Sequence, residues 1–124
     1  MKNDLSLLFL RLSFAGVMLI SHGLPKVLKY SQMKNSFPDP LGIGSSASLL
    51  LTIFAEVICP IFIILGYKTR LFSIPLIITM LIAGFVIHAG DQWSKIEFPL
   101  LYSFSFMSLL ISGSGKYSLD RRLS

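Results

Sequence analysis

Four apolar runs, each close to the length that crosses a lipid bilayer, constrain this chain more than any other feature. They cover about residues 5–24, 46–66, 71–89 and 96–113. A helix needs roughly 20 apolar residues to cross the hydrocarbon, and none of the runs alternates as a membrane-barrel strand does. The composition agrees, because 14% of the residues are charged and soluble domains carry about 25%. The sequence therefore predicts one all-α domain over residues 1–124, an integral membrane four-helix bundle.

The connections between these runs differ in length. The segments 67–70 and 90–95 are short, so we expect the helices that they join to be antiparallel neighbours. Gly23 and Pro25 are predicted to break the first helix where it leaves the bilayer. The long outer loop that follows, to Ser45, is either a plain connector or a lid over a site. Its weakly amphipathic first half, "KVLKYSQMKNSF", either extends the first helix or lies in the interface.

Basic residues near the ends of the runs predict the orientation. The net charge is +5, without the dense basic patch that nucleic-acid binding requires, so the expected partner is the lipid bilayer. One side of the predicted bundle collects Lys2, Lys68, Arg70, Lys116, Arg121 and Arg122. The other side collects Lys26, Lys29, Lys34 and Lys95. The positive-inside rule then predicts a multi-pass protein with both termini in the cytoplasm.

Two ionisable residues lie inside the predicted spans. Arg11 is in the first and Glu56 near the middle of the second. Counted from the predicted span ends, their depths differ by about 5 Å. We therefore expect an Arg11–Glu56 ion pair, since either charge alone in the bilayer is costly. The pair either fixes the packing of the two helices or belongs to a ligand or proton site.

Polar residues also gather at the predicted outer mouth of the bundle. His22 and Lys26 lie at the end of the first span, His88 late in the third, and Glu97 at the start of the fourth. They form either a hydrated polar cap or a proton-active, ligand-binding cluster. Two histidines on different helices are also compatible with axial haem ligation or a metal site. Neither set is complete, so no metal is predicted.

Two further helix faces carry small polar residues. Ser48, Thr52 and Glu56 are spaced by four in the second span and share a face. In the fourth span the serines at 105, 108 and 112 form another. Small polar residues commonly pack membrane helices together, which is the role expected for the serine face.

The ordered set of these residues resembles the DoxX family of small bacterial four-span membrane proteins. The features that carry the resemblance are Arg11, "HGLPK" at 22–26, Glu56, "GYKTR" at 66–70, His88, Glu97 and "GSGKYSLD" at 113–120. The resemblance covers nearly the whole chain and implies a location in the bacterial inner membrane.

The family resemblance implies a subunit of a membrane oxidoreductase or a quinone-linked redox complex. The chain has no GxGxxG and no HExxH motif, so the catalytic residues stay unassigned and any cofactor is a mobile quinone or sits on a partner. The candidate site residues are Arg11, His22, Lys26, Glu56, His88 and Glu97. Two alternatives remain: a non-catalytic accessory or assembly subunit of a larger complex or homo-oligomer, and a small-molecule carrier.

Overall fold

The computed structural model describes residues 2–123, and the regular structure in that part of the chain is all helical. The first long helix is continuous and comprises α1 (Lys2–Leu10), η1 (Arg11–Ala15), α2 (Gly16–Met18), η2 (Leu19–Gly23) and α3 (Leu24–Leu28). The short α4 (Tyr30–Met33) follows. The second long helix comprises α5 (Ser45–Ile53), η3 (Phe54–Ile58) and α6 (Cys59–Leu65). The rest comprises α7 (Thr69–Ile82), η4 (Ala83–Ile87), α8 (Trp93–Ser112) and α9 (Leu119–Leu123).

Between residues 2 and 123, three helices are long and apolar enough to cross a membrane. They are Lys2–Leu28, Ser45–Leu65 and Thr69–Ile87. The fourth long helix, α8, has 20 residues and therefore a length of about 30 Å. Its first turns carry Lys95 and Glu97, which lower its mean hydropathy. The predicted all-α class is confirmed, with three apolar helices and a fourth toward the C-terminus.

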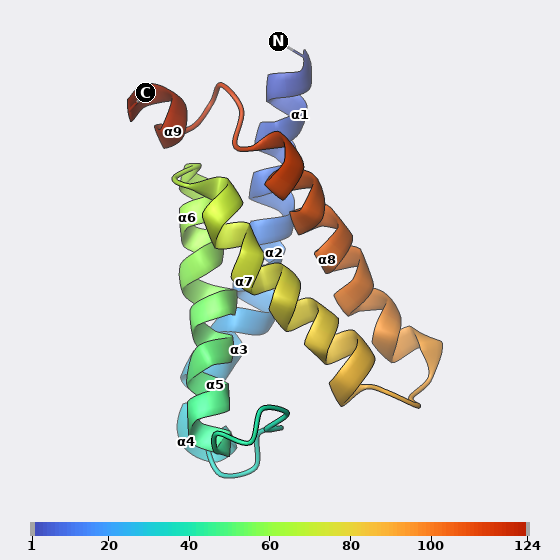
Figure 1. Ribbon diagram of the computed structural model, residues 1–124. Coiled ribbons are helices and arrows are strands. Elements are labelled where there is room, and N and C mark those ends of the chain that lie inside the picture. Colours follow the sequence, from blue (N-terminus) through green and yellow to red (C-terminus); the bar gives the residue numbers. More distant parts are fainter. Residues whose placement is uncertain (1, 124) are drawn as a thin grey trace.

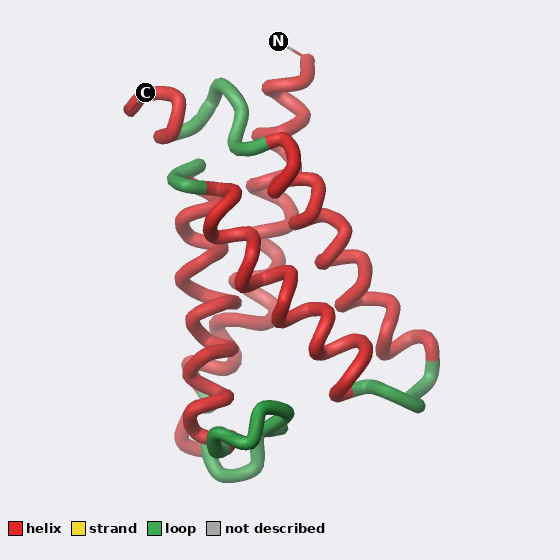
Figure 2. Tube along the Cα trace, in the orientation of Figure 1, coloured by secondary structure: helices red, strands yellow, loops and turns green. Residues whose placement is uncertain are grey.

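The helices alternate in direction, and both ends of the chain lie at the same end of the molecule (Figure 1). Loops are confined to the two ends of the bundle (Figure 2). All four long helices contribute to one apolar core, which includes Met18, Cys59, Leu76 and Phe106, each with no exposed surface. Large apolar side chains elsewhere point outward, as expected where the surrounding solvent is lipid.

The first helix does not end at Gly23 and Pro25, so the predicted break is wrong. Both residues lie inside the helix, which continues to Leu28. Pro25 lies two residues after the end of the π-helical segment η2, in the first turn of α3. A π turn shifts the hydrogen-bond partners by one residue, which accommodates a proline that has no N–H to donate.

The serine face predicted to pack the fourth helix is also wrong. Ser108 and Ser112 are exposed and Ser105 is half-buried, while Ser103 is fully buried. The hydroxyls of Ser105 and Ser112 donate to the carbonyls of Leu101 and Ser108 in the same helix. A serine that satisfies its own hydroxyl in this way can face lipid, so its spacing alone does not identify the packed face.

α7 and α8 pack closely along each other and splay away from α5 (Figure 1). The helices come together at the end that holds the termini, which we call the closed end. They separate toward the loops 34–44 and 88–92, which we call the open end. The candidate site lies between the separating helices.

Candidate functional site

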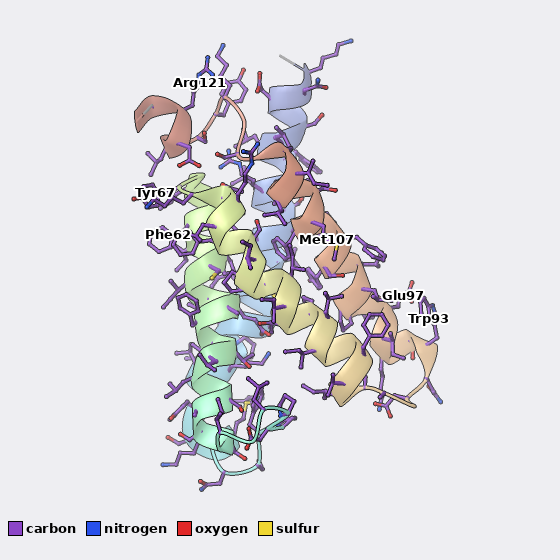
Figure 3. All side chains as sticks on the ribbon, in the orientation of Figure 1. Phe62, Tyr67, Trp93, Glu97, Met107 and Arg121 are labelled. Carbon is purple, nitrogen blue, oxygen red and sulfur yellow. The ribbon has the colours of Figure 1, made fainter. Side chains whose placement is uncertain are left out.

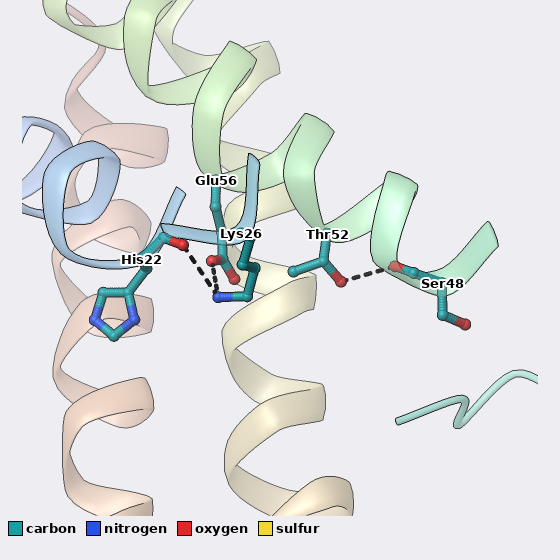
Figure 4. Close-up of polar contacts among 5 residues, drawn as sticks. All are labelled: His22, Lys26, Ser48, Thr52 and Glu56. Atoms are coloured by element: carbon teal, nitrogen blue, oxygen red, sulfur yellow. Dashed lines mark hydrogen bonds and ion pairs between the residues drawn. The ribbon is translucent and has the colours of Figure 1, made fainter. Parts of the chain in front are cut away.

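An ion pair joins the first two long helices inside the bundle. Lys26 on α3 extends its ammonium to the Glu56 carboxylate on η3, with 2.6 Å between Nζ and Oε1 (Figure 4). The side chains are 18% and 4% exposed, respectively. The same ammonium donates to the backbone carbonyl of His22 at 3.3 Å. Glu56 therefore has a cationic partner in the apolar interior, where an unpaired carboxylate is strongly unfavourable.

Gly23 explains why these two side chains meet. It packs against the backbone of Glu56 so closely that an added Cβ would lie 2.8 Å from the Glu56 carbonyl carbon and 2.8 Å from Val57 Cγ2. Only a residue without a side chain permits this approach. The contact fixes the register of the antiparallel helices at Glu56, and Lys26, one turn beyond, then reaches the carboxylate.

An apolar cavity of about 880 Å³ adjoins the ion pair. Its walls come from the first, second, third and fourth long helices, and residues 37–41 of the loop cover part of it. His22, Lys26 and Glu56 line it together with Ser48, Thr52 and Tyr102. The predicted shared face of Ser48, Thr52 and Glu56 is confirmed, because all three line this cavity (Figure 4). Concave, mostly apolar walls with a few convergent polar groups are typical of small-molecule sites.

His22 presents a ring with no hydrogen bond to its nitrogens among the described residues. The imidazole is half-buried and contacts Tyr102 on α8 edge to face, with ring centroids 5.5 Å apart at 84°. Both rings line the cavity. Tyr102 was not among the residues predicted from sequence. Its only sequence signal is an aromatic ring on a helix rich in aromatics, and that signal does not distinguish a site from a core.

His88 and Glu97, predicted to lie together at the outer mouth, lie apart in the structure. His88 lines the cavity near the open end, and its Nδ1 lies 3.0 Å from Asp91 Oδ2 in the adjoining turn. Glu97 is exposed, does not line the cavity, and points away from the bundle, as does Trp93 (Figure 3). Of the predicted outer cluster, His22, Lys26 and His88 therefore share one cavity and Glu97 does not.

Arg11 lies far from this site, and the predicted Arg11–Glu56 ion pair is wrong. Arg11 is fully buried at the closed end. Its Nη1 donates to the backbone carbonyls of Ile63 at 3.2 Å and Ile64 at 3.1 Å, and its Nη2 donates to that of Tyr117. The guanidinium thus satisfies carbonyls at the C-terminus of α6, where the helix dipole favours a cation. Arg11 fastens the C-terminal segment to the bundle and does not line the cavity.

Three of the predicted residues share a backbone feature. Arg11, His22 and Glu56 all lie in π-helical segments, and His88 follows directly after a fourth. A π turn widens the helix and redirects its side chains, and such turns are frequent at functional sites. The regular 3.6-residue spacing used to read the sequence does not hold across them.

One aspartate anchors the loop over the cavity. Asp39 accepts hydrogen bonds from Ser48 Oγ at 2.7 Å, from the Gly44 amide at 2.7 Å and from the Ile43 amide at 3.0 Å. These donors, the Ser48 hydroxyl first and the Gly44 amide next, hold the pKa of the Asp39 carboxyl below its ordinary value. Phe37, Pro38, Pro40 and Leu41 line the cavity on either side of Asp39. The loop is therefore fixed at one point and covers the site with apolar side chains.

The polar side chains around the cavity are better suited to hydrogen bonding than to binding a metal ion. Between residues 2 and 123, no group of three or more His, Cys, Asp or Glu side chains is placed to hold a metal ion. The groups that converge on the cavity are suited to hydrogen bonding, because Lys26 is a donor and neutral His22 is both donor and acceptor. The cavity therefore has the shape and the polar groups of a site for an amphipathic molecule.

Comparison with known proteins identifies the family. Residues 6–89 match the DoxX family. An uncharacterized protein of Haemophilus influenzae is 32% identical over 94% of this chain and 89% of its own length. An uncharacterized membrane protein of Mycobacterium tuberculosis is 29% identical over 88% of this chain and 76% of its own.

A second Haemophilus influenzae protein is 30% identical over 73% of this chain, and this chain spans 64% of that relative's length, under two thirds. No solved structure is significantly similar to the chain. The family match covers more than half of the sequence, and the relatives align along most of it. The chain therefore belongs to the DoxX family and is a multi-pass membrane protein.

Proposed function

We propose that this DoxX protein is an inner-membrane subunit of a quinone-linked oxidoreductase complex and that it binds the quinone between its helices. One observation carries the proposal: an apolar cavity of about 880 Å³ has the Lys26–Glu56 ion pair in its wall. A ligand that is apolar overall, with a polar ring that accepts hydrogen bonds, is complementary to that wall.

The residues at the cavity fit a quinone head. The Lys26 ammonium has three N–H groups, of which Glu56 and the His22 carbonyl take two, so one can reach a ligand carbonyl. The His22 ring supplies a further polar group. Leu51, Phe54 and Ile78 line the cavity and are also exposed at its rim, on the second and third helices. These rim residues give a lipid-soluble ligand a route from the bilayer.

The role of the chain in a redox reaction would be to hold the quinone and move protons. Reduction of a quinone to a quinol consumes electrons and protons. Glu56 and His22 would exchange the protons at the cavity wall, and a partner protein that carries a redox cofactor would supply the electrons. The chain's own residues account for binding, orientation and proton exchange only.

The proposal includes four membrane crossings. α8 has the length of a span, and its Lys95 and Glu97 sit in its first turns, where they can reach the headgroup region. Both termini are then on the same side, and the Lys and Arg distribution favours the cytoplasm.

The two alternatives fit the cavity less well. A non-catalytic accessory subunit predicts a bundle packed without a cavity, and a carrier requires two alternating openings. The described helices converge at the closed end, where Arg11 fastens α6 to the C-terminal segment, so an alternating opening there would have to break these hydrogen bonds. If the cavity binds no quinone, the accessory subunit and the carrier both become better explanations than a quinone-linked subunit.

The test is direct binding. The purified full chain in lipid nanodiscs should bind a decyl-substituted benzoquinone saturably, as measured by native mass spectrometry. Glu56→Gln should weaken binding by about tenfold or more, because it removes the charge that holds Lys26 at the cavity wall. Glu97→Gln is the matched control, since the same change is made on an exposed residue outside the cavity. Absence of saturable binding by the wild-type chain would rule out the proposed function.

A further inference from the structure

Tyr102 occupies a position on α8 that packing fixes from several sides. Its ring contacts Phe14 edge to face at 6.1 Å, stacks on Phe106 at 6.4 Å, and meets the His22 ring at 5.5 Å. These neighbours come from the first and fourth long helices. A ring held by three others has little freedom to turn, so the direction of its hydroxyl is preorganised.

Tyr102 lines the apolar cavity, and its hydroxyl has no hydrogen-bond partner among the described residues. Water can satisfy an exposed tyrosine, but a hydroxyl directed into an apolar space between membrane helices loses that partner. Two charged groups of this wall, Lys26 and Glu56, pair with each other. Tyr102, with its unpaired hydroxyl, and His22, with its unpaired ring nitrogens, line the same cavity.

We propose that Tyr102 is a ligand-binding residue that donates a hydrogen bond to an oxygen of the bound ring from the α8 side of the cavity. Lys26 and Glu56 meet the ligand from the first and second helices, so the ligand bridges the two halves of the splayed bundle. This inference rests on the proposed function, because it needs a ligand with an acceptor oxygen in this cavity. It lies outside residues 6–89, so the family match does not bear on it.

The experiment separates the hydrogen bond from ring packing by using two probes. A decyl-substituted benzoquinone carries acceptor oxygens, and decylbenzene does not. Tyr102→Phe removes only the hydroxyl, so Kd for the quinone should rise about 3- to 10-fold, the value of one hydrogen bond. Kd for decylbenzene should stay unchanged. The full chain in nanodiscs is titrated by native mass spectrometry, and thermal unfolding verifies that the variants fold.

Tyr67→Phe is the matched control. The Tyr67 ring lies tilted against Phe62 at the closed end, outside the cavity, so loss of its hydroxyl should leave both affinities unchanged (Figure 3). If the wild-type chain binds the quinone and Tyr102→Phe binds it equally well, the inference is overturned while the proposed function stands. An equal loss for both probes also overturns it, because the ring then acts through packing. If wild type binds no quinone, the proposed function fails first and the inference fails with it.

Discussion

Gly23 allows the first two membrane helices to touch backbone to backbone. The contact is at Glu56, and it places the ion pair with Lys26 beside the cavity. Membrane helices gain little from burying apolar surface against one another, since lipid is equally apolar, so close approach at small residues contributes much of their packing. The residue therefore supports both the stability and the site.

Replacing this glycine should destabilise the bundle. Gly23→Ala adds a Cβ that would overlap the Glu56 backbone, so the helices must move apart, at a cost of about 1–3 kcal/mol. Gly16→Ala is the matched control on the same helix, because its Cβ would meet no atom within 4 Å. It should be neutral or stabilising by up to about 1 kcal/mol. Thermal unfolding in one detergent ranks the two, and equal melting temperatures would refute the register role of Gly23.

The position of Arg11 shows that the sequence alone does not predict how the first two long helices align along their length. An arginine inside an apolar run is conspicuous in the sequence, but its predicted depth depends on the predicted span ends, and the helix extends from Lys2 to Leu28. The Gly23–Glu56 contact sets the register instead. Arg11 then lies level with Ile63, seven residues beyond Glu56 and about 10 Å farther along the helix. Contacts between distant residues decide the register, and hydropathy carries no information on them.

The loop 34–44 depends on a single anchoring side chain. Asp39 binds two amides near the start of α5 and the Ser48 hydroxyl, and apolar loop residues next to it cover the cavity. The charged carboxylate is the stronger acceptor for these donors. The order of this loop should therefore depend on the protonation state of Asp39.

We expect the loop to loosen in acid. The folded-state pKa of Asp39 is depressed, so the anchor is fully present above the ordinary aspartate pKa of about 3.9. It is lost as the pH falls through the lower folded-state value. A spin label at Leu41→Cys should become mobile in that range, and Asp39→Asn should make it mobile at every pH. Asp91→Asn, in the other loop at the open end, is the control. A mobility profile that Asp39→Asn leaves unchanged would exclude the anchor.

At the scale of elements, the sequence predicted the number and order of the long helices well. Apolar length and short connections are local properties, so the turns at 67–70 and 90–95 were placed within a few residues. The π-helical segments were not predictable, because hydropathy and helical spacing are local properties and carry no signal for them. For the same reason the pairing of Lys26 with Glu56, and the part of Tyr102 in the cavity, required the structure.

The whole molecule is asymmetric along its length. At the closed end Arg11 binds the carbonyl ends of α6 and the C-terminal segment, and Asp120 accepts from the Lys68 amide at 2.8 Å and Ser114 Oγ at 2.8 Å. At the open end the helices separate around the cavity. The contacts at the closed end hold the helices together, and the cavity lies between the helices where they separate.

The number of membrane crossings and the orientation can be tested together. Cys59 is fully buried, so a membrane-impermeant maleimide should not react with it and single cysteines can be added to the wild-type chain. Asp91→Cys lies before α8 and Lys116→Cys after it, and both positions are exposed. If α8 crosses the membrane with the termini in the cytoplasm, intact cells should label position 91, and position 116 only after permeabilisation. The reverse pattern would keep the four crossings and invert the orientation. Labelling of both positions in intact cells would mean that α8 does not cross, and the cavity would then open along a helix that lies on the membrane surface.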